Sequence, residues 1–123
     1  NPVALDLATS LEAWVPASQM LQLGFYAEPR HLQGNGAVHG GVVTTMLDFG
    51  LAFVVLARLQ PPRVAVTVAL NVHFERAVMP GALQVHARID RLGGRMAFAS
   101  AELSATGSRD VLARATATLA IVG

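Results

Sequence analysis

The residues best suited to chemistry are a His-Gly-Gly run and a carboxylate that follows it inside an apolar stretch. His39, Gly40 and Gly41 stand where a long apolar segment begins, and Asp48 lies further along it. The start of a helix offers unpaired N–H donors and a partial positive charge, which a carbonyl oxygen needs as it becomes an oxyanion. A lone carboxylate in an apolar helix is costly unless it is paired or takes part in a reaction. The pair of features therefore points to attack on a carbonyl group.

Each feature alone also has a purely structural interpretation. The two glycines could simply belong to a loop before a helix, and His39 could be a loop or core histidine. Asp48 could be paired with Arg58 or with another Arg. The combination is more informative than either part, because a donor at Gly40 and a carboxylate at Asp48 would lie about 12 Å apart along one helix.

That separation predicts that the site is shared between two chains. At that separation, Asp48 does not reach a carbonyl held at the start of its own helix. Two such helices packed antiparallel across a two-fold axis would bring Asp48 of one chain near Gly40 of the other. We therefore expect a dimer with two equal sites.

The elements that must position these residues are a long central helix and the segments before it. The apolar spacing of Val3, Leu7, Leu11 and Trp14 predicts an N-terminal helix over residues 2–15. Residues 20–27 alternate as a strand, and residues 29–36 form a loop. From Gly41 to Leu59 the sequence predicts one helix that is apolar nearly all round, as burial on every side requires.

From residue 64 onward the apolar period changes from 3.6 to 2. The first predicted strand carries its apolar residues at every second position from Val64 to Phe74, with Thr67 on the opposite face. Three more alternating runs follow, separated by turns at residues 80–81, 93–94 and 106–108. Tight turns predict an antiparallel meander, and its apolar face predicts a sheet wrapped around the long helix, an α+β fold.

Composition limits the classes of function. The chain has 123 residues, 53% of them apolar, which predicts one domain over residues 1–123 and allows burial between subunits. The net charge is +1, all nine basic residues are Arg and no basic run occurs, so nucleic acid is a poor partner. Cys is absent, which rules out disulfides and is compatible with the cytoplasm. We expect no signal peptide, no membrane span and no metal; His73-x-Glu75 is better interpreted as a solvated polar face.

The stretch from His39 to Asp48, His-Gly-Gly-Val-Val-Thr-Thr-Met-Leu-Asp, resembles the "HGG…D" signature of the hotdog-fold thioesterases, in particular the phenylacetate-degradation (PaaI-like) acyl-CoA thioesterases. Residues 67–74 resemble the second strand of that family, and the turns at 80–81 and 93–95 fall where the family has its turns. The resemblance covers about residues 20–122. It implies a hotdog fold, hydrolysis of an acyl-CoA thioester, no bound cofactor other than the CoA of the substrate, and a homotetramer built from dimers.

The resemblance also implies roles for individual residues. Gly40 resembles the residue whose amide polarises the thioester carbonyl, and Asp48 matches the carboxylate that attacks it or activates water. Gln33 stands where relatives hold the carbonyl or the water, His39 orients the site, and Thr67 matches a residue that assists in some relatives. The expected substrate contacts are Gly41 at the helix start, Phe49 and Met46 in the acyl pocket, and Arg76, Arg95 and Arg63 at the CoA phosphates.

Two alternatives remain at the level of the sequence. A hotdog hydratase or dehydratase would use a His with an acidic residue, and the long helix contains no His. A non-enzymatic acyl-CoA-binding module would not need the carboxylate at Asp48. The acyl group, aromatic or aliphatic, is left open.

Overall fold

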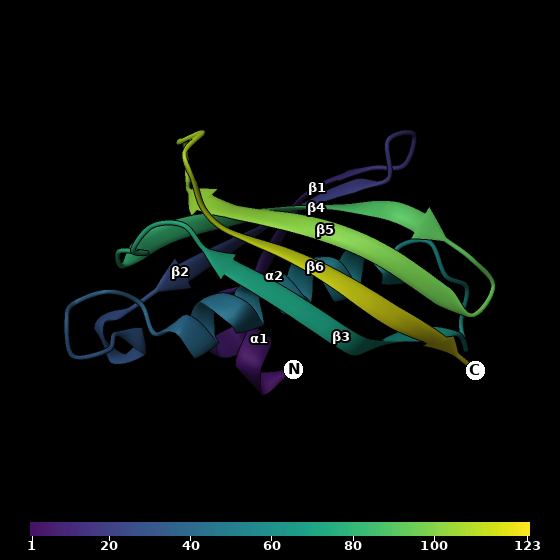
Figure 1. Ribbon diagram of the computed structural model, residues 1–123, viewed down its shortest axis with the longest axis horizontal. Coiled ribbons are helices and arrows are strands. Elements are labelled where there is room, and N and C mark those ends of the chain that lie inside the picture. Colours follow the sequence, from purple (N-terminus) through teal and green to yellow (C-terminus); the bar gives the residue numbers. More distant parts are fainter.

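The computed structural model describes all residues, 1–123 (Figure 1). A short helix and two strands precede a long helix, and four longer strands complete the chain. The elements are α1 Pro2–Asp6, β1 Ser10–Val15, β2 Met20–Ala27, a 3₁₀ turn Pro29–His31, α2 Gly40–Leu56, β3 Val64–Phe74, β4 Gly81–Leu92, β5 Met96–Ala105 and β6 Val111–Val122.

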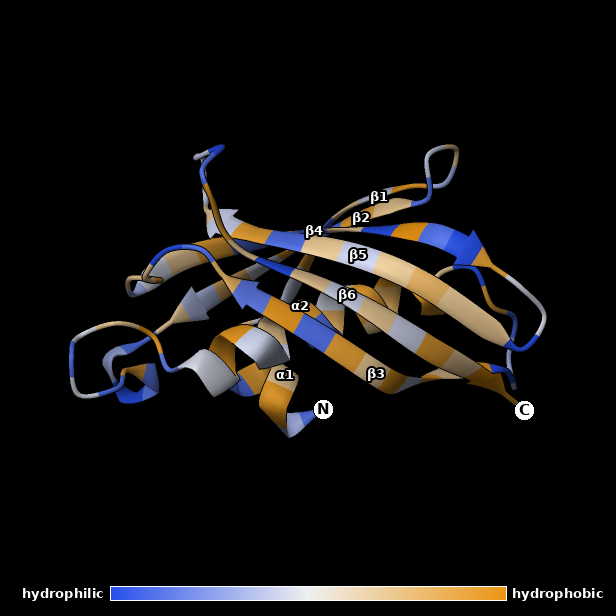
Figure 2. Ribbon diagram, viewed as in Figure 1, coloured by the Kyte–Doolittle hydropathy of each residue, from blue (hydrophilic) through white to orange (hydrophobic).

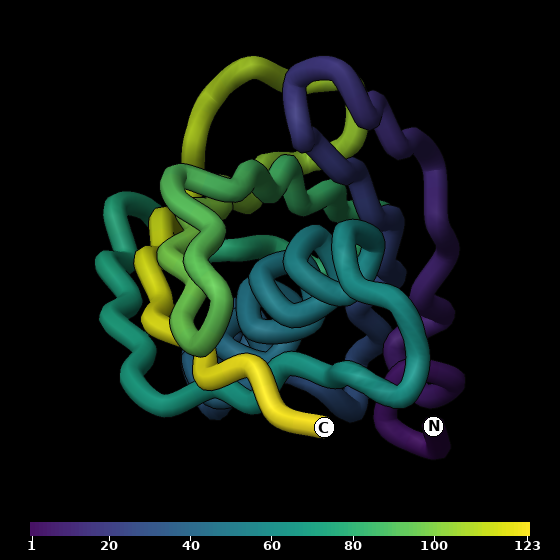
Figure 3. Tube along the Cα trace, turned by 90° about the vertical axis from the view of Figure 1, so that its right-hand side faces the viewer, coloured from purple at the N-terminus to yellow at the C-terminus, as the bar shows by residue number.

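The six strands form one antiparallel sheet in the order β1-β2-β4-β5-β6-β3, which leaves β1 and β3 at its edges. Seen from the end, the sheet curves around α2, which occupies the centre of the molecule (Figure 3). The α+β fold expected from the sequence, a sheet wrapped around one long helix, is confirmed.

Small residues let α2 lie close to the sheet. The inward faces of β5 and β6 consist largely of buried alanines, such as Ala99 and Ala115. A Cβ atom added at Gly50 would lie 2.6 Å from Cγ1 of Val85 on β4, so only glycine fits there without a shift of the helix or the strand. Apolar colouring runs along α2 in the hydropathy view (Figure 2).

The prediction of a helix over residues 2–15 is wrong beyond residue 6. The helix α1 ends at Asp6, Ala8 adopts a φ of 52°, and residues 10–15 form β1. These residues form a strand although their apolar spacing suits a helix, because their N–H and C=O groups form hydrogen bonds with the neighbouring strand β2. Of the four apolar residues on which the prediction rested, only Leu7 is buried in the core.

The central helix matches its prediction closely but ends three residues early, at Leu56 instead of Leu59. Seven of its residues are buried. One strip, which includes Thr44, Thr45 and Asp48, is only half-buried within the chain, so burial on every side does not hold for a single copy. No helix in the chain combines the length and the apolar character needed to cross a membrane.

The predicted four-strand meander is right for β4, β5 and β6 and wrong for β3. The strand β3 pairs with β6 and not with β4, so residues 75–80 cross over the end of the sheet instead of making a hairpin. Val78, on this crossover, is buried, and its carbonyl accepts a hydrogen bond from Val38 N–H at 2.7 Å. The crossover is thereby attached to the loop that precedes α2.

A β-bulge in β3 reverses the predicted faces of its first half only; after the bulge, Leu70 and Val72 pack against the core, as predicted. The register of β3 on β6 shifts between Thr67 and Ala69. Before the shift, Val64 and Val66 point outward and are 44% and 51% exposed, whereas Thr67 points toward α2. Val68, at the bulge, is 62% exposed. An extra residue in one strand moves all following side chains to the opposite face, and alternation alone does not reveal it.

Candidate active site

The start of α2 leaves one N–H group free. His39 is the N-cap residue, and its Nδ1 accepts a hydrogen bond from Gly41 N–H at 3.0 Å. The N–H groups of Val42 and Val43 both donate to the carbonyl of His39. Gly40 N–H has no partner in the chain. The helix therefore presents a single unpaired donor at its positive end, and the sequence had placed the donor at this residue.

A cleft of about 450 Å³ lies at this end of the helix. It is formed by the loop before α2, the first turn of α2, and the crossover after β3. The lining residues are Gln33, Asn35, Ala37, Val38, Gly40, Val43, Phe74, Glu75, Arg76, Ala77 and Val78. The cleft brings together Gln33, Gly40 and Arg76 of the residues expected from the sequence.

Phe74 and the neighbours of Arg76 on the crossover, Glu75, Ala77 and Val78, were not predicted to belong to the site. A Cβ atom added at Gly40 would lie 3.4 Å from Cζ of Phe74, so the end of β3 closes one side of the cleft. No signal in the sequence reveals this contact, because it depends on the crossover between β3 and β4.

Asp48 and Thr67 form a second group, away from this cleft. Thr67 Oγ1 donates a hydrogen bond to Asp48 Oδ1 at 2.8 Å, and both residues are half-buried. Asp48 has no ion pair within the chain, so the pairing with Arg58 or another Arg is not found. One neutral hydroxyl thus contacts Oδ1 of Asp48, and no side chain of the same chain contacts its Oδ2.

The apolar candidates on α2 face the core. Met46 is completely buried, and Phe49 is half-buried. The ring of Phe49 stacks on that of Phe53, with centroids 5.6 Å apart, and also on Phe25 of β2. Neither Met46 nor Phe49 lines the cleft within one chain. Gly41 is exposed at the helix start, beside the His39 ring.

The three candidate arginines lie in two places. Arg76 lines the cleft, and its Nη1 is 4.0 Å from Asp110. Arg63 precedes β3 and donates to the carbonyl of Gly94, next to Arg95. The 11 residues of β3 separate Arg63 from Arg76 by about 36 Å. One chain therefore cannot direct all three toward a single cleft.

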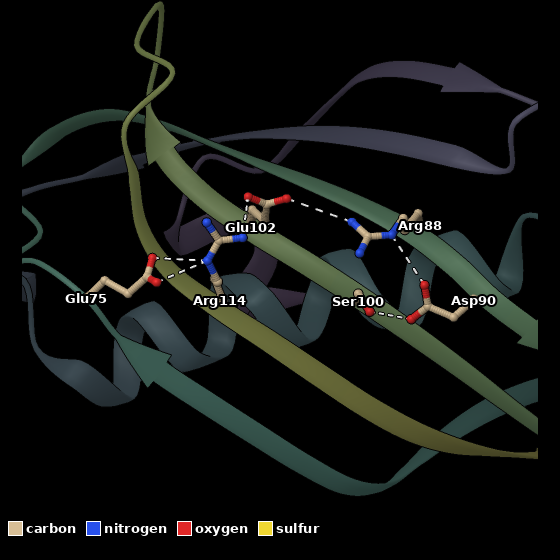
Figure 4. A network of polar contacts seen from close by, with 6 residues as sticks. All are labelled: Glu75, Arg88, Asp90, Ser100, Glu102 and Arg114. Carbon is tan, nitrogen blue, oxygen red and sulfur yellow. Dashed lines mark hydrogen bonds and ion pairs between the residues drawn. The ribbon is translucent and has the colours of Figure 1, made fainter.

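The face of the sheet opposite α2 carries a network of charged side chains (Figure 4). Arg114 binds Glu75 through its Nε at 3.1 Å and Glu102 through its Nη1 at 3.0 Å, and Arg88 continues the network toward Asp90. Glu75 is thus paired with Arg114, and the His73-x-Glu75 pair belongs to a solvated face. No three His, Cys, Asp or Glu side chains are grouped to hold a metal ion.

The chain resembles known proteins in sequence and in fold. The model of the thioesterase superfamily matches residues 35–112, which include Gly40, Asp48 and Thr67. PA0474 of Pseudomonas aeruginosa, an esterase by name, is 37% identical to this chain over 100 residues. The matched residues cover 80% of this chain and 75% of that protein.

Solved structures share the fold. A phenylacetic acid degradation-related protein from Ralstonia eutropha JMP134 superposes with a TM-score of 0.92 and 32% identity, covering 97% of this chain and 89% of that one. The BH2602 protein from Bacillus halodurans, solved with CoA, superposes with a TM-score of 0.77 and 23% identity, covering 82% of this chain and 66% of that one. The second likeness is one of fold alone.

Proposed function

Because the chain belongs to the thioesterase superfamily and is a thioester hydrolase, we propose that it hydrolyses an acyl-CoA with Gly40 N–H as the oxyanion donor. Acyl-CoA and water give a carboxylic acid and free CoA. The observation that carries the proposal is the single unpaired N–H at the start of a 17-residue helix, on a residue that lines a cleft. A donor placed where the carbonyl oxygen gains negative charge lowers the barrier to the tetrahedral intermediate.

Asp48 of a second copy supplies the base or the nucleophile. As a base, it takes a proton from a water molecule whose oxygen attacks the carbonyl carbon; the C–S bond then breaks and the thiolate takes up the proton. As a nucleophile, its oxygen attacks the same carbon, and the C–S bond breaks to release the CoA thiolate. Water then hydrolyses the resulting anhydride, which frees Asp48 and the carboxylic acid, and the thiolate takes up the remaining proton. Thr67 holds Asp48 in either case, Gln33 holds the carbonyl or the water, and His39 orients the helix start.

A second copy is part of this proposal because Gly40 and Asp48 are about 12 Å apart along α2. Antiparallel packing of two α2 helices across a two-fold axis covers the half-buried strip at Thr44, Thr45 and Asp48. The same packing brings Arg63 and Arg95 of one copy toward the cleft of the other copy, which contains Arg76. The CoA phosphates would lie between these arginines. We infer a dimer as the minimal active unit and a tetramer as the full assembly.

The cytoplasmic location stays a prediction, to be tested by cell fractionation.

The test is release of CoA thiol from a panel of aromatic and aliphatic acyl-CoA thioesters by the parent and by Asp48→Asn. The chain contains no Cys, so a thiol reagent reports released CoA without background from the protein. We expect Asp48→Asn to lower turnover by about 100- to 10,000-fold, the usual contribution of a general base. The thermal midpoint should hold, because the Asn oxygen can still accept from Thr67.

Two results would contradict the proposal. Retained turnover with a large drop in thermal midpoint would make Asp48 a structural residue. Acyl-CoA that binds the parent but stays intact would favour a binding module, and hydration of an enoyl-CoA without thiol release would favour a hydratase.

A further inference from the structure

His31 is the one titratable side chain that is buried in this protein, and the proposed reaction does not use it. The residue is 7% exposed, and the other buried polar residue is Ser104. Its Nδ1 accepts a hydrogen bond from Glu28 N–H at 3.0 Å, so the neutral ring carries its proton on Nε2. That Nε2–H donates to Oδ2 of Asp6 at 2.9 Å. Both ring nitrogens are therefore used, and neither faces a ligand.

The backbone of His31 connects the ring to the cleft. His39 N–H donates to the carbonyl of His31 at 2.8 Å, which closes the loop of residues 31–39. Within this loop, Leu32 forms an isolated antiparallel β-bridge with Val38, and Gln33 N–H donates a hydrogen bond to the carbonyl of Ala37. Gln33 lies two residues after His31, and Gly40 is the residue next to His39. The position of His31 thus determines where both cleft residues lie.

The other end of this chain of contacts is anchored in α1. Asp6 precedes Leu7, which is buried in the core, and the carbonyl of Leu7 accepts a hydrogen bond from Tyr26 N–H at 3.0 Å. Arg30 also pairs with Asp6 at 2.6 Å, but both side chains are about half exposed, so that ion pair contributes little.

We propose that His31, held by Asp6, is a positioning residue for the Gly40 donor and for Gln33, and that α1 is thereby part of the catalytic machinery. The inference rests on the proposed function for its kinetic readout. A displacement of a reacting group by about 1 Å costs up to about 100-fold in rate, and CoA is held by other groups. Loss of the Asp6–His31 contact should therefore lower kcat about 10- to 100-fold and leave KM within about twofold.

The experiment compares three single variants with the parent, well below their thermal midpoints. His31→Asn keeps an acceptor near Nδ1 for Glu28 N–H but is too short to reach Asp6, whereas His31→Gln keeps a donor that can reach it. Asp6→Ala breaks the contact from the exposed side, where folding is not at risk. We expect His31→Asn and Asp6→Ala to lower kcat equally, the double variant to be no worse than either, and His31→Gln to recover part of the loss. Arg30→Gln, the matched control, should keep the kcat of the parent.

A second readout separates this inference from the proposed function. The NMR signal of the Gly40 amide should shift in His31→Asn and in Asp6→Ala but not in Arg30→Gln, whether or not the parent hydrolyses thioesters. If the parent releases no thiol but these NMR shifts occur, the proposed function is rejected, whereas the coupling of the Asp6–His31 contact to Gly40 stands. Variants with lower thermal midpoints but unchanged kcat and an unchanged Gly40 signal would show that His31 serves stability alone, and would overturn the inference.

Discussion

Gly40 combines an unpaired N–H with the absence of a side chain, and these two properties can be separated by substitution. The space beside it admits one methyl group, because an added Cβ would lie 3.4 Å from Phe74. His39, with φ −56° and ψ 135°, has the backbone conformation that a residue before proline prefers. Proline is also tolerated at the first position of a helix, where the N–H has no helical partner.

Gly40→Pro should therefore fold and assemble but lose the donor, since proline has no N–H. We expect turnover to fall about 100- to 1000-fold, as when one oxyanion-hole donor is removed elsewhere. Gly40→Ala keeps the N–H and adds the same Cβ, so it should stay within about tenfold of the parent. Thiol release and circular dichroism measure the two effects. Equal loss in both variants would attribute the effect to the side chain, and normal turnover in Gly40→Pro would place the donor elsewhere.

At the scale of elements, three segments distant in sequence come together around the cleft. The loop of residues 31–39 carries Gln33, the helix α2 carries Gly40, and the crossover of residues 75–80 closes the other side. The loop is attached to the crossover by the hydrogen bond from Val38 N–H to the carbonyl of Val78, and it leads directly into α2. The helix α1 joins them through Asp6 and His31, so the N-terminal segment bears on the site without lining it.

The Asp6 contact predicts a pH dependence of stability. The hydrogen bond from His31, assisted by the charge of Arg30 and opposed by partial burial, lowers the pKa of the Asp6 carboxyl below 3.8. A carboxyl whose pKa falls on folding stabilises the fold above its unfolded pKa, and this contribution is lost as the pH falls through the folded pKa. The thermal midpoint of the parent should exceed that of Asp6→Asn at pH 7. The difference should shrink as the pH falls below 3.8 and vanish only once the pH is below the folded pKa of Asp6. Asp110→Asn, whose nearest cation is 4.0 Å away, is the control and should show little difference at either pH. A difference in thermal midpoint between the parent and Asp6→Asn that persists in acid would argue against the contact.

At the scale of the whole molecule, one chain contains each half of the proposed site but does not join them. The cleft holds Gly40 and Gln33, while Asp48 and Thr67 lie on the half-buried strip of α2. The strand β3, beside that strip, has no partner strand along its outer edge. The proposed second copy of the chain would account for both features.

Mixing two inactive variants tests this arrangement directly. In a mixed dimer of Gly40→Pro and Asp48→Asn, one site contains both substitutions and the other contains neither. Random assembly after unfolding and refolding together should therefore restore activity at about a quarter of all sites. The Gly40→Pro/Asp48→Asn double variant, mixed with itself, is the matched control and should stay inactive. If the mixture does not recover, Gly40 and Asp48 act within the same chain, and sedimentation as an active monomer would reject the assembly altogether.

The sequence by itself determined the central helix, the strands β2, β4, β5 and β6, and the family. These elements carry strong local signals: apolar periods of 3.6 or 2, with proline or glycine at their ends. The His-Gly-Gly run and Asp48 were also visible locally, because both depend on residues that are close in the chain. The free N–H at Gly40 follows from the same local geometry, since the start of a helix always leaves donors to be satisfied.

Only the tertiary structure decided the features that depend on distant partners. Residues 10–15 form a strand because β2 offers them an edge, although their spacing suits a helix. The bulge at Thr67 turns that side chain toward Asp48, and pairing with β6, not with the next strand, sends the crossover to the cleft. The buried His31 was not singled out, because its importance arises from Asp6, which lies 25 residues away. In each case the free energy comes from pairing or burial between segments far apart in the chain, and a local pattern contains no record of that pairing.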